Sequence, residues 1–311
     1  MASLIEQAAQ RLEQLRQAGA LAPDALPAVV PAPATRPAEP APPLPLAAQS
    51  HDEPSGRGSK SVELNLNALA VKGYLTPGSP RTPMADQYRV IKRPLIKNAV
   101  GQGAATLNHA NLIMVTSALA GEGKSFTSLN LAMSVAAELD HTVMLVDADV
   151  ARPSLLRMLG LPPGPGLLDV LEGQAEMTDV LLRTNVDKLT LLPSGTPHPR
   201  ATELLASEAM RELLNDMAQR YPDRIIIFDS PPLLLTTESR VLATQMGQIV
   251  IVVAAEATPQ NAVQQALAAV ENCPLKLMLL NQVRGDTSGA YGYGYGYGYG
   301  YEHDDDATRT A

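Results

Sequence analysis

A short segment near the middle of the chain combines glycines, a lysine and a serine in the order that phosphate binding requires. After the apolar residues 112–115, the sequence continues as AGEGKS over residues 120–125. Glycine lets the main chain approach an anion closely, and the backbone N–H groups of such a turn can surround a phosphate. Lys124 adds a positive charge, and Ser125 adds a hydroxyl that can bind Mg²⁺. The segment therefore predicts a phosphate-binding loop (P-loop).

The residues that follow this loop have the apolar spacing of a helix as far as residue 139. The helix would point the positive end of its dipole at the phosphate. One position departs from the strict motif, because Ala118 stands where glycine is usual. The alternative is a glycine-containing turn before an ordinary helix. We expect the following residues at the nucleotide: Ala120, Gly121, Glu122, Gly123, Lys124, Ser125 and Phe126.

Two further segments place carboxylates at the ends of apolar runs. VMLVDAD ends with Asp147 and Asp149, which share one face of an extended strand because they are two residues apart. They can hold Mg²⁺ or accept a proton from an attacking hydroxyl, unless one of them only caps the next helix. Arg152 could neutralise phosphate or pair with an aspartate. Asp229 ends RIIIFD, a Walker B pattern, and completes the parts needed for Mg²⁺-dependent phosphoryl transfer.

These side chains need a sheet that brings strand ends together. From residue 111 onward, apolar runs typical of buried strands alternate with helical patterns. Strands are expected at 111–116, 142–147, 189–192, 224–229, 248–254 and 275–280. Helices are expected at 124–139, 153–159, 175–184, 201–220, 236–246 and 259–271. The pattern predicts an α/β three-layer sandwich, with a mainly parallel central sheet and helices on both faces. Ligands then bind at the carboxyl ends of the strands.

One amide also falls at such a strand end. Asn281 ends the run LMLLN, where it could read an adenine base or simply form a turn.

The chain divides into four predicted regions. Residues 1–19 form an amphipathic helix that docks on a partner or a membrane surface, or that has no role. Residues 20–80 form a disordered Pro/Ala-rich and polar linker, in which 61–75 suit either a short strand or a helix. The domain spans 81–288. Residues 289–311 form a disordered Tyr/Gly-rich acidic tail, because alternating glycine carries a large ordering entropy.

Within the domain, residues 84–97 look helical until Pro94. Asp86, Arg89 and Lys92 occur there at three-residue spacing, a pattern that is most often a solvated charged face.

Composition excludes several classes of protein. The net charge of −8 argues against a nucleic-acid partner. No run approaches the roughly 18–20 apolar residues of a membrane span, and the N-terminus does not resemble a secretory signal. We therefore expect a cytoplasmic protein whose membrane association is peripheral or goes through a partner.

The three motifs together resemble the bacterial tyrosine kinases (BY-kinases), P-loop proteins related to the MinD/ParA ATPases. AGEGKS corresponds to Walker A, VMLVDAD with Arg152 to Walker A′, and IIIFDSPP to Walker B. The resemblance runs from about Asp86 to Gly285, and the tyrosine-rich tail also fits. Ala120 stands where the family usually has proline. The N-terminal helix, linker and tail most resemble the XrtA-associated (EpsG-like) autokinases of exopolysaccharide systems.

The resemblance implies ATP and Mg²⁺ as cofactors and assigns roles to residues. Lys124 would hold the phosphates, Ser125 with Asp149 and Asp229 would hold the metal, and Asp147 would be the base. The family's Glu-x-x-Arg-x-x-Arg oligomerisation helix matches Asp86, Arg89 and Lys92, with same-charge replacements at both ends. The implied phosphate acceptors are the tail tyrosines Tyr291, Tyr293, Tyr295, Tyr297, Tyr299 and Tyr301.

The resemblance also implies partners and a setting. It suggests a ring-like homo-oligomer that phosphorylates in trans, an inner-membrane chain-length determinant as activator, and a phosphotyrosine phosphatase. Two other readings remain open at this point. One is a MinD/ParA-like ATPase switch that transfers nothing to protein. The other is a non-catalytic adaptor that keeps the P-loop for folding.

Overall fold

The computed structural model describes residues 60–78, 81–103, 107–220 and 223–284. The predictions for the N-terminal helix, for most of the linker and for the tyrosine-rich tail therefore lie outside the described residues. Among the described residues, no helix combines the length and the apolar character needed to cross a bilayer.

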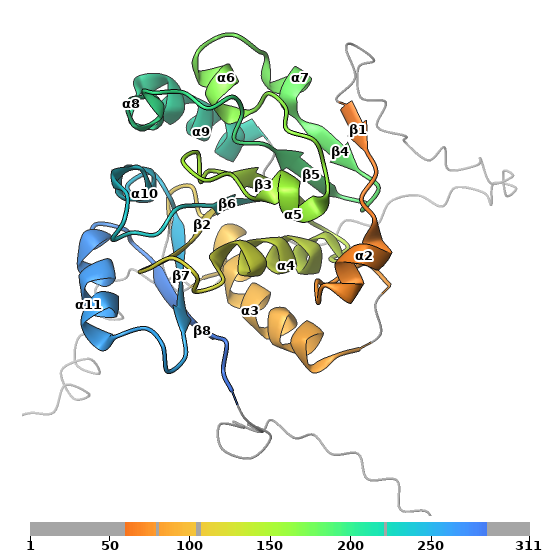
Figure 1. Ribbon diagram of the computed structural model, residues 1–311, viewed down its shortest axis with the longest axis vertical. Helices are drawn as coiled ribbons and strands as arrows, with labels where there is room; N and C mark the ends of the chain where they lie inside the picture. Colours follow the sequence, from red (N-terminus) through yellow and green to blue (C-terminus); the bar gives the residue numbers. More distant parts are fainter. Residues whose placement is uncertain (1–59, 79–80, 104–106, 221–222, 285–311) are drawn as a thin grey trace, which may run out of the picture. The chain divides into compact units, whose positions relative to one another are not determined.

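The described residues form one 8-stranded sheet in the order β1-β4-β5-β3-β6-β2-β7-β8 (Figure 1). From β5 to β8 every neighbouring pair is parallel, whereas β4 is antiparallel to β5 and β1 is parallel to β4. The mainly parallel sheet is therefore confirmed. In chain order the strands are β1 Lys60–Val62, β2 Leu112–Ser117, β3 Thr142–Asp147, β4 Leu182–Thr184, β5 Leu189–Leu192, β6 Arg224–Asp229, β7 Gln248–Ala254 and β8 Lys276–Asn281.

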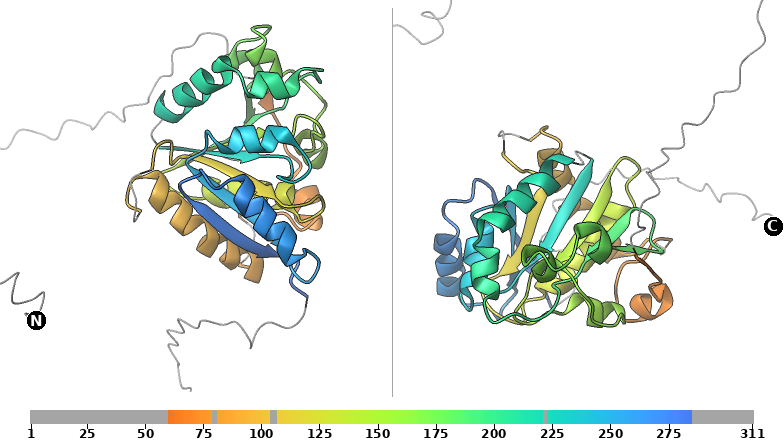
Figure 2. Two further views of the ribbon diagram at one scale, coloured as in Figure 1. Left: turned by 90° about the vertical axis from the view of Figure 1, so that its left-hand side faces the viewer. Right: turned by 90° about the horizontal axis from the view of Figure 1, so that it is seen from above.

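Helices cover both faces of the sheet, as predicted (Figures 1 and 2). One apolar core lies under α2 Leu66–Val71, α3 Pro83–Ala99, α4 Lys124–Ala136 and α5 Leu155–Leu159. The other lies under α6 Leu167–Leu171, α7 Met177–Val180, α8 Ala201–Leu205, α9 Glu208–Arg220, α10 Thr237–Ala243 and α11 Gln260–Ala269. Every residue of β2 and of β7 is buried. Continuous apolar runs mark such strands because both of their faces are covered.

The predicted linker ends too late. Residues 60–62 form β1, which pairs with β4 at one edge of the sheet, and residues 66–71 form α2. The segment 61–75 therefore contains a strand and then a helix. Asn65 begins α2, and its side chain accepts a hydrogen bond from the N–H of Ala68. Leu64 and Leu69 are buried in the core, so residues from 60 onward belong to the folded domain.

The predicted end of a helix at Pro94 is also wrong, because α3 continues through it to Ala99. Proline removes the hydrogen bond that its N–H would donate to the carbonyl four residues earlier, at Val90. Val90 has 73% of its surface exposed, so water can satisfy that carbonyl. The helix tolerates the proline because the lost bond falls on its outer face.

Two predicted helices are interrupted. The pattern over 175–184 contains α7 and then β4, because Leu182–Thr184 pair with strands on both sides. The pattern over 201–220 contains α8 and α9. Ser207 separates them by accepting a hydrogen bond from the N–H of Met210, which starts a new helix. Helix α6 was not predicted.

Lys92 does not lie on an exposed charged face with Asp86 and Arg89. Asp86 and Arg89 form an exposed ion pair, whereas the Lys92 side chain is only 5% exposed. Its Nζ lies 2.7 Å from Oε1 of Glu138 and donates to the carbonyl of Ser134. The Lys92 contact holds the pKa of Glu138 below its usual value. Lys92 therefore fastens α3 to the end of α4 within one subunit, which corrects its predicted place in an interface.

Replacing Lys92 with methionine is expected to lower the free energy of unfolding by about 2 kcal/mol, because it removes the closest cation of the partly buried Glu138 carboxylate and leaves the exposed Arg93, 3.8 Å away. Urea denaturation at pH 7 measures this. Arg89→Met is the matched control, and removing its exposed ion pair should change stability by less than about 0.5 kcal/mol. Equal stability of Lys92→Met and the parent protein would contradict the structural role.

Candidate active site

The P-loop joins the carboxyl end of β2 to the start of α4. Gly121 and Gly123 have φ angles of 86° and 91°, which side chains other than glycine rarely adopt. Gly123 is the N-cap of α4, so the free N–H groups of the first helical turn face the loop. Ala118 is fully buried and does not have a positive φ. The alanine is tolerated because only the two later positions of the loop need glycine.

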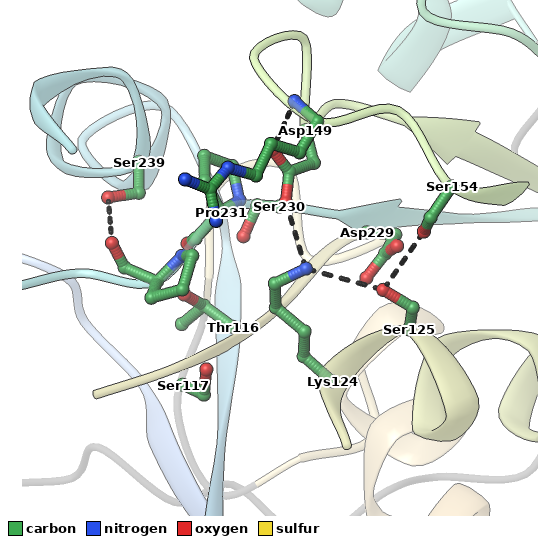
Figure 3. A network of polar contacts seen from close by, with 12 residues as sticks. Thr116, Ser117, Lys124, Ser125, Asp149, Ser154, Asp229, Ser230, Pro231 and Ser239 are labelled. Carbon is green, nitrogen blue, oxygen red and sulfur yellow. Dashed lines mark hydrogen bonds and ion pairs between the residues drawn. The ribbon is translucent and has the colours of Figure 1, made fainter. Parts of the chain in front are cut away.

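Lys124 and Ser125 lie at the centre of a polar network (Figure 3). The Nζ of Lys124 lies 2.9 Å from Oδ2 of Asp149 and 3.3 Å from Oγ of Ser125. Ser154 donates from its hydroxyl to Oγ of Ser125 at 3.3 Å. The predicted lysine, serine and aspartate are therefore brought together from the start of α4 and the loop after β3.

Asp147 and Asp229 are directly opposite one another on the neighbouring strands β3 and β6. Burial raises the pKa of Asp147 to about 7, and the charges of Asp229 and Asp149 add to this effect. Burial likewise raises the pKa of Asp229 to about 6, although Lys124 and the hydroxyls of Ser125 and Ser128 act in the opposite direction. One oxygen of each carboxylate, Oδ1 of Asp147 and Oδ2 of Asp229, is buried without a hydrogen-bond partner.

The other oxygen of each aspartate is already bound. Oδ2 of Asp147 accepts from the N–H groups of Ser154 and Leu155, so this residue does cap α5. Oδ1 of Asp229 accepts from the hydroxyl of Ser128 at 3.0 Å. Asp147 is only 1% exposed and does not line the pocket described next, whereas Asp149 does. Capping therefore uses Oδ2 of Asp147 and leaves Oδ1 without a partner.

A pocket of about 730 Å³ opens over these groups. Lys124, Ser125 and Asp149 form its polar floor, and Arg152 lies exposed on its wall. Phe126 also lines it, and its ring packs against Tyr74 with centroids 5.2 Å apart. The predicted lining residues present are Ala120, Gly121, Gly123, Lys124, Ser125, Phe126, Asp149 and Arg152. Its size and polarity suit a nucleotide.

The amide of Asn281 does not point into this pocket to read a base. Its Nδ2 donates to the carbonyl of Glu122 at 3.0 Å, and Nε2 of Gln282 donates to the carbonyl of Gly121 at 2.9 Å. A β-carbon on Gly123 would come within 2.2 Å of Nδ2 of Asn281. The Glu122 carboxylate, buried below the loop, accepts from the hydroxyl of Thr258 and from the N–H of Leu119. The carboxyl end of β8 thus supports the P-loop from behind.

Replacing Asn281 with alanine is expected to weaken the binding of ATP about fivefold, because one supporting hydrogen bond of the P-loop is worth about 1 kcal/mol. Binding titrations with ATP, the nucleotide that the resemblance implies, measure this effect. Asn98→Ala is the control, since its Nδ2 makes a hydrogen bond of similar length (3.0 Å) to Gln248 elsewhere. If both variants bind ATP like the parent protein, Asn281 does not position the loop.

Sequence reasoning missed four residues that shape the site. Ser128 lies one helical turn after Ser125 on the same face, a spacing that could have revealed it. Ser154, Thr258 and Gln282 come from loops or strand ends far away in sequence, and no pattern marked them.

The oxygen atoms around Lys124 fit a Mg²⁺ ion that is bound together with a nucleotide. No group of three or more His, Cys, Asp or Glu side chains among the described residues is arranged to hold a metal ion. The unpartnered Oδ2 of Asp229, the Asp149 carboxylate and the Ser125 hydroxyl nevertheless offer the hard oxygen ligands that Mg²⁺ prefers. Mg²⁺ characteristically uses one or two carboxylates together with substrate phosphates and water. The residues present therefore fit a metal that arrives with its nucleotide.

Comparison with known proteins shows which family the chain resembles. A family model described as an AAA domain matches residues 110–279. Tyrosine-protein kinase YwqD of Bacillus subtilis (strain 168) is 31% identical over 234 residues, which cover 75% of this chain and 95% of YwqD. Tyrosine-protein kinase CpsD of Streptococcus agalactiae is 32% identical over 187 residues, covering 58% of this chain and 80% of CpsD.

A solved structure agrees with these relatives. The kinase domain of VpsO superposes with a TM-score of 0.52 at 27% identity, covering 65% of this chain and 100% of that one. The family-model match over residues 110–279 includes the strands and loops that carry the P-loop and the three aspartates. The chain therefore belongs to the bacterial tyrosine kinases of the P-loop class, and it is a nucleotide-binding protein-tyrosine kinase.

Proposed function

We propose that this kinase uses ATP and Mg²⁺ to phosphorylate the tyrosine cluster of its own C-terminal tail. The observation that carries the proposal is the convergence of Lys124, Ser125 and Asp149 in one pocket, next to the buried Asp147 and Asp229. A chain with this site also carries six closely spaced tyrosines, at 291, 293, 295, 297, 299 and 301.

The chemistry is an in-line transfer. The tyrosine oxygen forms a bond to the γ-phosphorus while the bond from that phosphorus to the oxygen of ADP breaks. The hydroxyl proton passes to a carboxylate, for which we propose Oδ1 of Asp147. A pKa of about 7 suits a general base at neutral pH, whereas free tyrosine has a pKa near 10. Lys124 and the N–H groups of the P-loop stabilise the charge that develops on the phosphates.

The metal would be held by Ser125, Asp149 and Asp229. When bound, Mg²⁺ neutralises charge on the phosphates and helps to orient them. Arg152, exposed at the pocket, supplies a further positive charge toward the nucleotide or the incoming tail.

We propose that transfer occurs in trans within a ring-like homo-oligomer. As a flexible Gly-rich chain, residues 289–301 would span roughly 20 Å, enough to reach the site of a touching neighbour. Asp86 and Arg89 remain candidates for the contact between subunits because both are exposed. Each phosphorylation adds about −1.5 to −2 charge beside an acidic C-terminus, so a modified tail is repelled from acidic sites and the ring loosens.

The wider setting rests on the resemblance of the N-terminal region and tail to the XrtA-associated autokinases. We propose a role in regulating exopolysaccharide synthesis or export, at the cytoplasmic side of the inner membrane. An inner-membrane chain-length determinant would activate the kinase, and a phosphotyrosine phosphatase would reset it.

Incubation with γ-labelled ATP and Mg²⁺ tests this function. Label is expected on tail tyrosines and should disappear when all six become phenylalanine. Mixing a Lys124→Met chain with an active chain that lacks residues 289–311 tests the trans mode, because the inactive chain should then become labelled. ATP turnover without protein label would instead indicate an ATPase switch. An unlabelled mixture would indicate transfer within one chain.

A further inference from the structure

A second groove of the described structure lies away from the nucleotide pocket. It measures about 850 Å³ and runs between α3 and β8, which lie side by side (Figures 1 and 2). Its apolar wall consists of Val90, Ile91, Pro94, Leu277, Leu279 and Val283. Val90 and Val283 are 73% and 47% exposed. Apolar grooves of this kind are commonly binding surfaces.

Strand β8 is also the last strand of the sheet among the described residues. The carbonyls of Leu275 and Asn281 accept hydrogen bonds from the N–H groups of Ile249 in β7 and of Ala255 directly after it. Because alternate residues of a strand point their N–H and C=O groups to opposite sides, Met278 and Leu280 direct theirs to the open edge. Such an edge is a template for another strand.

We propose that residues 290–301 of the same chain occupy this groove as an additional, antiparallel strand on β8. Three observations select this occupant. The tail begins within a few residues of Val283, which itself lines the groove. The connection is rich in turn-forming residues, Gly285, Asp286, Ser288 and Gly289, which favour reversal of the chain. Residues 290–301 alternate Tyr and Gly over almost their whole length, which matches the period of a strand.

In an extended strand, every tyrosine from 291 to 301 falls on the same face. With that face toward α3, the rings pack against the apolar wall, and glycine leaves the opposite face free of side chains. Tyrosine also needs a partner for its hydroxyl when its ring is buried. Asp86 and Gln87 lie on the rim of the groove and can accept hydrogen bonds there. In isolation, a Tyr/Gly tail is not expected to form a strand, because nothing offsets its ordering entropy. Packing of the tyrosine rings in the groove would supply that stabilisation.

Amide hydrogen exchange, measured residue by residue without nucleotide, tests the docking. The full chain is compared with a chain that ends after Ser288, both at concentrations where each is monomeric. The amides of Met278 and Leu280 should exchange at least about tenfold more slowly in the full chain. Equal exchange in the two chains would overturn the proposal. Protection that grows with protein concentration would also overturn it, because a second copy would then be the occupant.

Matched variants identify the contact. Replacing the six tail tyrosines with serine should abolish the protection, whereas replacing them with phenylalanine should keep it. Val90→Lys should abolish it by placing a charge in the groove. Val71→Lys should not, because Val71 is also exposed (89%) but lies on α2. Protection that survives the serine variant or Val90→Lys would contradict the proposal. The measurement needs no ATP, so its outcome is independent of the proposed autokinase function.

Discussion

Replacing Lys124 with methionine is expected to lower the rate of tyrosine phosphorylation by about 10²–10³-fold, the usual effect of removing one group that stabilises transferring charge. Lys124 Nζ contacts both Asp149 and Ser125, so it positions the metal ligands as well as the phosphates. Without this ammonium, three neighbouring carboxylates lose the cation at their centre, and negative phosphates meet an uncompensated negative site. We therefore expect ATP binding and the transfer step to fail together.

Single-turnover assays with γ-labelled ATP separate these two effects, since they report transfer at saturating nucleotide. Lys97→Met provides the control, because Lys97 is exposed near the end of α3 and should leave both quantities unchanged. Full activity of Lys124→Met would refute the catalytic site proposed for this kinase.

Replacing Asp229 with asparagine is expected to have opposite effects on stability and on metal-dependent nucleotide binding. In the protein without ligand, the fully buried Asp229 carboxylate has a pKa of about 6 instead of 3.8. Because the pKa of this carboxylate is higher in the folded than in the unfolded protein, its protonation stabilises the fold. This contribution to the free energy of unfolding is fully present below about pH 4 and is lost as the pH rises through about 6. At pH 8 the charged form should therefore cost about 2–3 kcal/mol, and the variant should be more stable by about that amount.

Chemical denaturation of the protein and its variant at pH 4.5 and pH 8 tests the sign, because the difference should shrink toward the lower pH. The variant should also lose most of the increase in melting temperature that Mg²⁺ with ATP gives the parent protein, since stabilisation by a ligand follows its affinity. Asp187→Asn changes an exposed carboxylate and should alter stability by less than about 0.5 kcal/mol. A variant that is less stable than the parent at pH 8 would contradict this account.

The central sheet could be predicted closely because its strands are buried on both faces and read as continuous apolar runs. Residues 248–254, for example, are strand in both the prediction and the structure. The P-loop and the aspartates at strand ends could also be located, since a parallel sheet brings those ends together. Short elements such as α6 and β4 escaped because the packing partners of a few residues decide their structure, and periodicity over a few residues does not identify them.

The errors at the site have a common physical origin. The match to the family's helix motif predicts an interface role for Lys92, and the strand-end position predicts a base-reading role for Asn281. Each instead satisfies a group inside the subunit. Sequence spacing shows which residues share a face of a helix or a strand end. It does not show whether a buried carboxylate or carbonyl lies within reach. Buried polar groups need partners, and only the tertiary structure shows which side chains supply them.

The hydrogen bonds from Asn281 and Gln282 to the P-loop carbonyls also link the conformation of the tail to the binding of nucleotide. The chain passes from these two residues directly toward the tail, so any state of the tail that shifts them also shifts the energy of the nucleotide-binding loop. Free-energy coupling of this kind is reciprocal. A partner that shifts these two residues when it binds the tail must change the affinity for ATP, and ATP must change the affinity for that partner by the same factor. A single measured factor would therefore describe communication in both directions.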